Sequence, residues 1–212
     1  MGMIGPAPGS PTRAELEIKR SRFLTLIARA DSEDKARAVV AAARREFPDA
    51  GHHCSAFIVP APGGHPIERS SDDGEPAGTA GMPILEALRG SGMECVVAVV
   101  VRYFGGIKLG TGGLVRAYRD AVAAALPQVP RVRAVRRSLF RLELPHTEAG
   151  RLESELRARG VDVVGTDFGA SGVTLTLATA EAAALEDLIA SLTSAAYSPV
   201  RAGEQISEEK VR

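Results

Sequence analysis

The sequence has 212 residues, of which 45% are hydrophobic and 25% charged, and its 26 Lys and Arg residues balance 26 Asp and Glu residues. This composition is typical of a globular protein with room for one large domain or two small ones. Aromatic residues make up only 4% and Trp is absent, which excludes an extensive stacking surface for single-stranded bases. No apolar run approaches the roughly twenty residues of a membrane span, no signal peptide is visible and the two cysteines form no disulfide framework, so we expect a cytoplasmic protein without a membrane partner.

The first part of the chain alternates apolar runs, typical of strands, with apolar residues at helical spacing. Residues 1–12 are rich in Gly and Pro, and we expect them to form a disordered tail. Asp31 resembles an N-cap, and Pro48 ends the helix that follows it. The expected elements are one or two strands over residues 16–30, a helix over 32–47, a strand over 54–59, a loop over 60–81, a helix over 84–88 and a buried strand over 96–101.

A second unit is expected after the arginine-rich residues 131–137, which we interpret as the junction between two domains. Its elements follow the order β-α-β-β-α-β, the split pattern of ferredoxin-like domains. They are strands over residues 139–144, 161–166, 173–178 and 197–205 and helices over 148–159 and 181–192. We therefore predict an α+β protein with one domain over residues 13–134 and a ferredoxin-like domain over residues 135–212.

The glycine-rich segment, residues 102–119, is the most informative part of the sequence. Its five glycines lie between an apolar strand and a helical pattern, where a glycine-rich turn exposes backbone N–H groups and the helix start adds a partial positive charge. This combination favours an anion, usually phosphate. The predicted anion-binding or nucleic-acid-binding residues are Arg102, Gly105, Gly106, Lys108, Gly110, Thr111, Gly112, Gly113, Arg116 and Arg119.

This segment departs from the common nucleotide-binding motifs. Lys108 precedes Gly110 and no Ser or Thr follows the lysine as a magnesium ligand, so a P-loop is poorly supported, and the spacing of a dinucleotide-binding motif is also missing. The alternative is that the glycines serve only tight turns and close packing. Charge favours an anionic partner, because residues 95–142 carry 9 Lys or Arg and 1 Asp or Glu. Some of these arginines could instead pair with the acidic residues 143–212.

The acidic loop, residues 70–83, is a second motif with three carboxylates. Asp72, Asp73 and Glu75 are oxygen ligands of the kind that magnesium takes, but they lack the spacing of an EF-hand. Asx-turn hydrogen bonds and salt bridges to the basic helix are a simpler interpretation. A cleft between the acidic loop and the glycine-rich segment would be lined by His53, Asp72, Asp73, Glu75 and Thr79.

Three adjacent residues, His52, His53 and Cys54, do not form a convincing metal or nucleophile site. Neighbouring residues on a strand point to opposite faces, so the three cannot chelate one ion together, and neither histidine is placed to act as a base for the cysteine. We therefore assign no catalytic and no metal-ligating residue, and expect no cofactor, with magnesium as the only weak candidate.

Four segments resemble the motifs of the YigZ/IMPACT family, namely residues 17–23, 53–57, 72–81 and 102–118. They occur in the family's order, and the resemblance covers about residues 13–205. It implies an N-terminal domain of the fold seen in domain two of ribosomal protein S-five and a C-terminal ferredoxin-like domain, the pair of folds that also closes elongation factor G. Although fold analogy alone does not carry function, the resemblance points towards RNA or the ribosome rather than a small metabolite.

The leading hypothesis is a non-enzymatic protein that binds RNA or the ribosome and has a role in translation regulation. Its glycine-rich segment would contact phosphates, which position a nucleic acid without reading its sequence. One alternative is a hydrolase-like, small-molecule enzyme with its cleft between residues 70–83 and 102–119. Another is a protein-interaction module for a translation factor. The sequence leaves the oligomeric state open.

Overall fold

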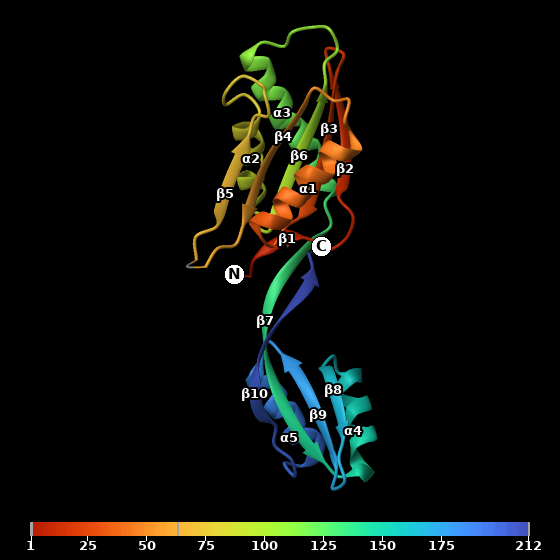
Figure 1. The fold of residues 1–212 in the computed structure, drawn as a ribbon. Helices are drawn as coiled ribbons and strands as arrows, with labels where there is room; N and C mark the ends of the chain where they lie inside the picture. Colours follow the sequence, from red (N-terminus) through yellow and green to blue (C-terminus); the bar gives the residue numbers. More distant parts are fainter. Residues whose placement is uncertain (1, 63, 212) are drawn as a thin grey trace. The chain divides into compact units, whose positions relative to one another are not determined.

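The computed structural model describes residues 2–62 and 64–211, and the chain has the α+β fold class predicted from the sequence. It divides into two compact units, formed mainly by Met3–Arg133 and by Ala134–Glu209. Figure 1 shows the helices and strands of each unit, and each unit has its own hydrophobic core. Within the described part of the chain, no helix has both the length and the apolar character needed to cross a membrane.

The first unit is built on a five-stranded antiparallel sheet with the strand order β2-β3-β6-β4-β5. Its strands are β2 (Thr12–Ile18), β3 (Ser21–Arg29), β4 (His52–Val59), β5 (Ile67–Ser71) and β6 (Val96–Tyr103). The central strand β6 is buried along residues 96–101 because helices cover both faces of the sheet. Burial on two faces explains why this strand is a continuous apolar run rather than an alternating one.

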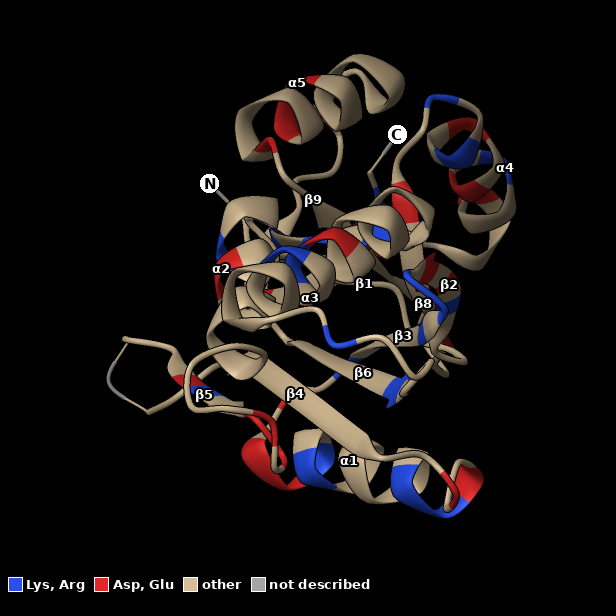
Figure 2. Cartoon of the chain, turned by 90° about the horizontal axis from the view of Figure 1, so that it is seen from above, with Lys and Arg blue, Asp and Glu red and all other residues tan. Residues whose placement is uncertain are grey.

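Three helices cover the two faces of this sheet (Figure 2). On one face, α1 (Glu33–Glu46) packs over Val97 and Val99. On the other face, α2 (Gly81–Ser91) and α3 (Thr111–Ala125), which continues into the short 3₁₀ helix η1 (Leu126–Gln128), pack over Ala98 and Val100. Because successive side chains of a strand point to opposite faces, this arrangement decides which helix each strand residue meets.

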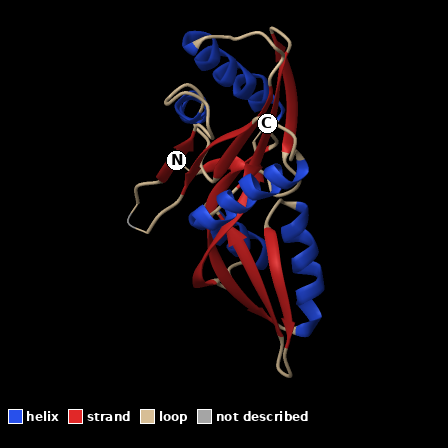
Figure 3. Cartoon of the chain, turned by 45° about the horizontal axis from the view of Figure 1, so that its top comes forward, coloured by secondary structure: helices blue, strands red, loops and turns tan. Residues whose placement is uncertain are grey.

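The second unit has the element order β-α-β-β-α-β that the sequence predicts (Figure 3). Its elements are β7 (Arg131–Leu144), α4 (His146–Ala158), β8 (Asp162–Phe168), β9 (Val173–Thr179), α5 (Ala182–Thr193) and β10 (Val200–Lys210). The strands lie in the order β10-β7-β9-β8, and their core side chains, such as Leu142 and Leu175, pack with Leu152 of α4 and Ile189 of α5. This is an arrangement of the split β-α-β type.

Two local predictions are wrong, whereas the junction predicted over residues 131–137 contains the boundary between the two units, which lies between Arg133 and Ala134. Residues 1–12 are not a disordered tail, because β1 (Ile4–Pro6) pairs with the start of β7 and the strand β2 begins at Thr12. The loop predicted over residues 60–81 contains β5. In each case backbone pairing with a neighbouring strand forms a strand whose own residues lack the apolar alternation from which strands are predicted.

Candidate nucleic-acid interface

The glycine-rich segment contains an open helix N-terminus. The loop after β6 ends at Gly110, which is the N-cap of α3 and has φ 72° and ψ 166°. A glycine has no side chain to cap the helix, and the first turn of α3 contains no acidic residue. The N–H groups of Thr111, Gly112 and Gly113 have no acceptor within the helix, as at every helix start. Together with the helix dipole, these N–H groups give the geometry of an anion site at the predicted place.

Gly105 has a packing role that the sequence did not predict. A Cβ atom at this position would overlap the backbone carbonyl of Arg20, and the N–H of Gly105 already donates to the Ser21 hydroxyl over 3.3 Å. Only glycine permits this close approach between the loop and the β2–β3 turn. The prediction of Gly105 as an anion ligand is therefore wrong, whereas a Cβ atom at Gly106 or Gly112 would meet open space.

The β2–β3 turn adds two cations beside this loop. Ile18 pairs with Ser21, so Lys19 and Arg20 form a two-residue turn, and both have left-handed backbone with φ 47° and 64°. Such turns normally use Asn and Gly, and because Lys19 and Arg20 stand in their place, this hairpin could not be predicted from the sequence. Both side chains are exposed, and the contact between Arg20 and Gly105 places the turn against the glycine-rich segment.

Three of the predicted cations are on the surface. Lys108, Arg116 and Arg119 are exposed, and Lys108 has no ion-pair partner among the described residues. Arg116 Nε donates to the backbone oxygen of Gly112 over 3.3 Å, so its side chain folds back towards the helix start, while Arg119 pairs with its neighbour Asp120 at 3.3 Å. The loop also exposes an aromatic ring, since Phe104 is 58% exposed.

Arg102 is not a surface cation, and its prediction as a phosphate contact is wrong. The central carbon of its guanidinium group lies 5.6 Å from the ring centre of Phe23 and 5.6 Å from that of Phe104. Its Nη1 donates a hydrogen bond to Glu75 Oε1 over 2.6 Å. The reason is its register on β6, because Arg102 faces the same side of the sheet as Val100, towards α3. The side chains of Arg102 and Glu75 are only 6% and 4% exposed.

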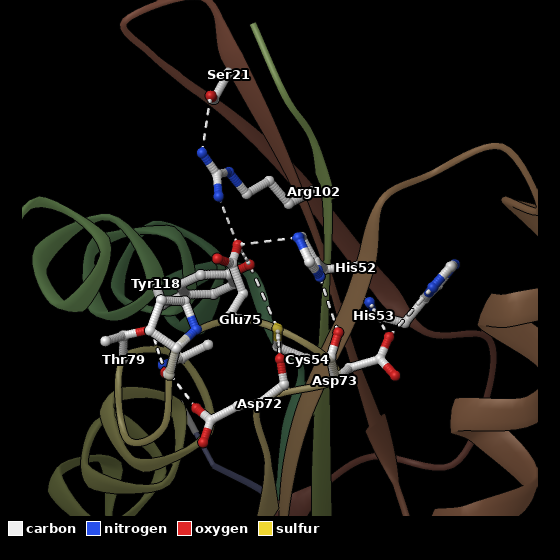
Figure 4. A network of polar contacts seen from close by, with 12 residues as sticks. Ser21, His52, His53, Cys54, Asp72, Asp73, Glu75, Thr79, Arg102 and Tyr118 are labelled. Carbon is white, nitrogen blue, oxygen red and sulfur yellow. Dashed lines mark hydrogen bonds and ion pairs between the residues drawn. The ribbon is translucent and has the colours of Figure 1, made fainter. Parts of the chain in front are cut away.

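The Glu75–Arg102 ion pair is the centre of a buried polar network (Figure 4). Tyr118 of α3 donates its hydroxyl hydrogen to Glu75 Oε1 over 2.8 Å, and His52 Nε2 of β4 lies 3.8 Å from the same oxygen. The Cys54 thiol lies 3.3 Å from the Tyr118 hydroxyl. Through Glu75 the network joins the acidic loop to Arg102 of β6 and to Tyr118 of α3, which lie near the two ends of the glycine-rich segment. These contacts hold β6 and α3 in place relative to each other.

Asp72 caps a helix at long range. The residue before α2, Ala80, has no side chain that could cap it, and Asp72 Oδ1 accepts hydrogen bonds from the N–H groups of Ala80 and Gly81 over 2.9 and 2.8 Å. Asp72 Oδ2 accepts a third from Gly78 over 2.8 Å. Burial on its own would raise the pKa of Asp72, but the three N–H donors together lower it below its ordinary value.

The remaining residues of the predicted cleft also bind groups of the protein itself. Asp73 accepts the N–H of His53 over 2.6 Å and pairs with Arg44 at 2.6 Å. The His53 ring donates to the Phe47 backbone oxygen over 2.9 Å, and the Thr79 hydroxyl donates to the Pro76 backbone oxygen over 2.7 Å. The predicted open cleft is therefore wrong for His53, Glu75 and Thr79, which are buried.

The three carboxylates of the acidic loop do not form a magnesium site. Asp72 is directed to the start of α2, Asp73 to Arg44 and Glu75 to Arg102, so each has a separate partner. Across the described residues, no group of three or more His, Cys, Asp and Glu side chains is placed to hold one metal ion. Their contacts join the acidic loop to α2, α1 and β6.

The buried thiol and phenol of the network are unreactive acids. Burial raises the pKa of Cys54 to about 12 and also raises the pKa of Tyr118 above its ordinary value. A thiol with so high a pKa is protonated at neutral pH and is a poor nucleophile. Cys54 is fully buried and is a residue of the hydrophobic core.

Comparisons with known proteins place the chain in a family. The family model of the Impact N-terminal domain matches residues 19–126, and that of a domain of unknown function, DUF1949, matches residues 142–196. The IMPACT family member YigZ of Escherichia coli (strain K12) is 43% identical over 77% of this chain and 80% of that protein. An IMPACT family member of Haemophilus influenzae is 42% identical over the same shares. The chain belongs to the IMPACT family.

A solved structure resembles this IMPACT family member along nearly its whole length. A crystal structure of a hypothetical protein is 38% identical, covers 94% of this chain and 97% of its own, and superposes with a TM-score of 0.60. The buried network and the glycine-rich segment lie inside the residues matched by the Impact N-terminal domain, from Ser21 to Tyr118.

The arginines that follow this domain are partly neutralised. Arg137 pairs with Asp162 at 3.3 Å and Glu209 at 2.6 Å, and Arg136 pairs with Glu204 at 3.4 Å. The alternative that some basic residues pair with the acidic C-terminal part is thus confirmed for these two arginines. Lys108 and Arg116 of the glycine-rich segment, by contrast, are exposed and form no ion pair with a described residue.

Proposed function

We propose that this IMPACT family member is a non-enzymatic cytoplasmic protein that binds RNA, on the ribosome or free, in a role that regulates translation. The observation that carries the proposal is the open N-terminus of α3, where Gly110 provides no cap and Lys108 lies two residues before it without an ion-pair partner among the described residues. A phosphate of the RNA backbone accepts hydrogen bonds from the N–H groups of Thr111, Gly112 and Gly113.

The cations around this helix start favour a polymer of phosphates over a single phosphate. Lys19 and Arg20 lie on a different segment from Lys108, and Arg116 and Arg119 extend along α3. A single phosphate occupies only the helix start, whereas a sugar–phosphate backbone reaches several of these cations at once. The exposed ring of Phe104 adds a surface on which one unpaired base stacks.

The role in translation is supported by the family resemblance. The motifs of the YigZ/IMPACT family and the order of its two domains imply the pair of folds that closes elongation factor G, which acts on the ribosome. No observation favours the small-molecule enzyme, since Asp72, Asp73 and Glu75 are each bound to groups of the protein. The experiment below distinguishes RNA binding from docking of a translation factor, because a protein that only docks on a translation factor has no affinity for RNA.

Fluorescence anisotropy with a labelled single-stranded RNA and an RNA duplex tests the proposal. We expect binding at low salt that weakens steeply as salt rises, because counterions are released from the phosphates. Lys108→Ala lowers the slope of log affinity against log salt by about 0.7 for a single strand, one phosphate contact, with the melting temperature almost unchanged. Arg45→Ala, which removes an exposed cation of α1, is the matched control and leaves the slope at the wild-type value.

Two results contradict the proposal. One is the absence of measurable affinity for any RNA or DNA at low salt, which leaves the translation-factor alternative as the better explanation. The other is normal RNA binding by Lys108→Ala, which removes the glycine-rich segment from the interface.

A further inference from the structure

A separate groove lies on the opposite face of the sheet from α3. The single helix α1 packs over β4 and β6 on this face of the five-stranded sheet, and residues 69–71 of the edge strand β5 are exposed. A cavity of about 410 Å³ lies there between α1 and the two strands. Small-molecule sites commonly occupy about 300–1,000 Å³. We call this cavity the α1–β5 groove.

The walls of the groove follow from helix and strand geometry. Arg37, Val40, Ala41 and Arg44 line one wall, and their spacing of three and four residues places them in one stripe along α1. The other wall is formed by two cross-strand pairs, Ser55 with Ser71 and Phe57 with Arg69. Residues directly opposite each other in an antiparallel pair share a face, so all four side chains lie on the α1 side of the sheet.

The groove contains a hydroxyl that has no hydrogen-bond partner among the described residues. Ser55 is only 7% exposed, lines the cavity, and its side chain makes no hydrogen bond to any described residue. Its neighbours on the same face, Phe57 and Val59, are apolar and pack in the core with α1. A hydroxyl that lines a cavity and has no partner in the protein is free to donate to, or accept from, a polar group of a ligand.

Three arginines give the groove a positive charge, and their guanidinium groups are accessible to a ligand. Arg69 forms no ion pair with a described residue, and its guanidinium donates only to the backbone oxygen of Glu68 over 3.0 Å. Arg37 and Arg44 pair with Glu33 and Asp73, but their side chains are 68% and 52% exposed. Ion pairs with exposed partners contribute little, so a ligand dianion competes with these carboxylates for the two guanidinium groups.

We propose that the α1–β5 groove binds a phosphorylated small molecule of the size of a nucleoside monophosphate. The phosphate contacts Arg69, Arg37 and Arg44, whose planar guanidinium groups match its oxygens, and the Ser55 hydroxyl donates to the ligand. The apolar surface of Phe57, Val40 and Ala41 receives the ring of the ligand. This site is independent of the proposed RNA interface, because it lies on the α1 face and the glycine-rich segment lies at α3.

Isothermal titration calorimetry with adenosine 5′-monophosphate tests this site, with adenosine and inorganic phosphate as partial probes. We expect the monophosphate to bind at least ten times more tightly than either partial probe, because each lacks one of the two matching surfaces. Arg69→Gln and Ser55→Ala each weaken binding of the monophosphate at least tenfold. Arg45→Gln, an exposed arginine of α1 outside the stripe, and Lys108→Ala of the RNA interface leave it unchanged.

Four outcomes overturn the assignment. The first is the absence of any heat of binding with adenosine 5′-monophosphate. The second is binding of inorganic phosphate that is as tight as binding of the monophosphate. The third is that both Arg69→Gln and Ser55→Ala bind the monophosphate as tightly as the wild-type protein does. Loss of binding in Lys108→Ala alone would move the ligand to α3 and also overturns it. Melting temperatures of the four variants, measured alongside, show that each is folded.

Discussion

The buried Glu75–Arg102 ion pair gives the sharpest prediction about stability. In Glu75→Gln the amide oxygen still accepts the hydrogen bond from Tyr118, so the change removes the negative charge and little else. Arg102 then carries a buried charge without a counterion, since its side chain is 6% exposed and Nη1 lies 2.6 Å from Glu75 Oε1. Removing one partner of a buried pair typically costs about 3–5 kcal/mol, so we expect the free energy of unfolding of the first unit to fall by about 3 kcal/mol.

Hydrogen–deuterium exchange of the β6 amides, followed by mass spectrometry, measures this change. The chain has two compact units, so a single global transition does not report on one of them, whereas the slowest amides of β6 report on the first unit. The double variant Glu75→Gln/Arg102→Met should recover most of the loss, because it removes both charges. Glu46→Gln, which breaks an exposed ion pair with Arg13, is the control. A loss in Glu75→Gln no larger than in this control would refute the reasoning.

Three further predictions follow from the same region. Asp72→Asn lowers the free energy of unfolding by about 1–2 kcal/mol at neutral pH. Because the pKa of Asp72 is lowered in the fold, the stability that the carboxylate contributes is present above its ordinary pKa of about 4 and is lost as the pH falls below that value. The melting temperatures of the two proteins should therefore converge towards acid pH, and melting temperatures that stay equally far apart would contradict this. Gly105→Ala lowers the free energy of unfolding, measured in urea, by about 1–3 kcal/mol, whereas Gly112→Ala, whose Cβ meets open space, does not lower it. Equal effects of the two changes would show that the contact of Gly105 with Arg20 is unimportant. Cys54, with a pKa of about 12, should resist alkylation by iodoacetamide in the native protein and react after unfolding; rapid native labelling detected by mass spectrometry would place the thiol on the surface.

The elements with strong periodicity could be predicted from the sequence. The apolar run at residues 96–101 is the central strand, and the helical spacing after Ser32 is α1. The order β-α-β-β-α-β could also be predicted, because β7, α4, β9 and α5 bury one face and so show the period of a strand or a helix. The strand β5 was missed because it is a polar edge strand, and the hydrogen bonds that define it come from β4.

The roles of single site residues could be predicted less well, because they depend on contacts between distant segments. Lys108 and Gly110 lie where the sequence places them, since a loop and a helix start are local features. Arg102 was assigned to the surface. It lies two residues after Val100 on β6, so both side chains point to the same face of the sheet, but the sequence does not show that this face is covered by α3. Lys19 and Arg20 were missed because the approach of Gly105 to their turn is visible only in three dimensions.

The most direct test of the central claim is a titration of the ¹H–¹⁵N NMR spectrum of the protein with a short single-stranded RNA at low salt. The proposed contact is made by the N–H groups at the start of α3. The account predicts that the resonances of Thr111, Gly112 and Gly113 move most, with that of Lys108, and return to their free positions as salt is added. RNA binding that leaves these three amides unmoved, or that shifts only residues elsewhere in the chain, would contradict it.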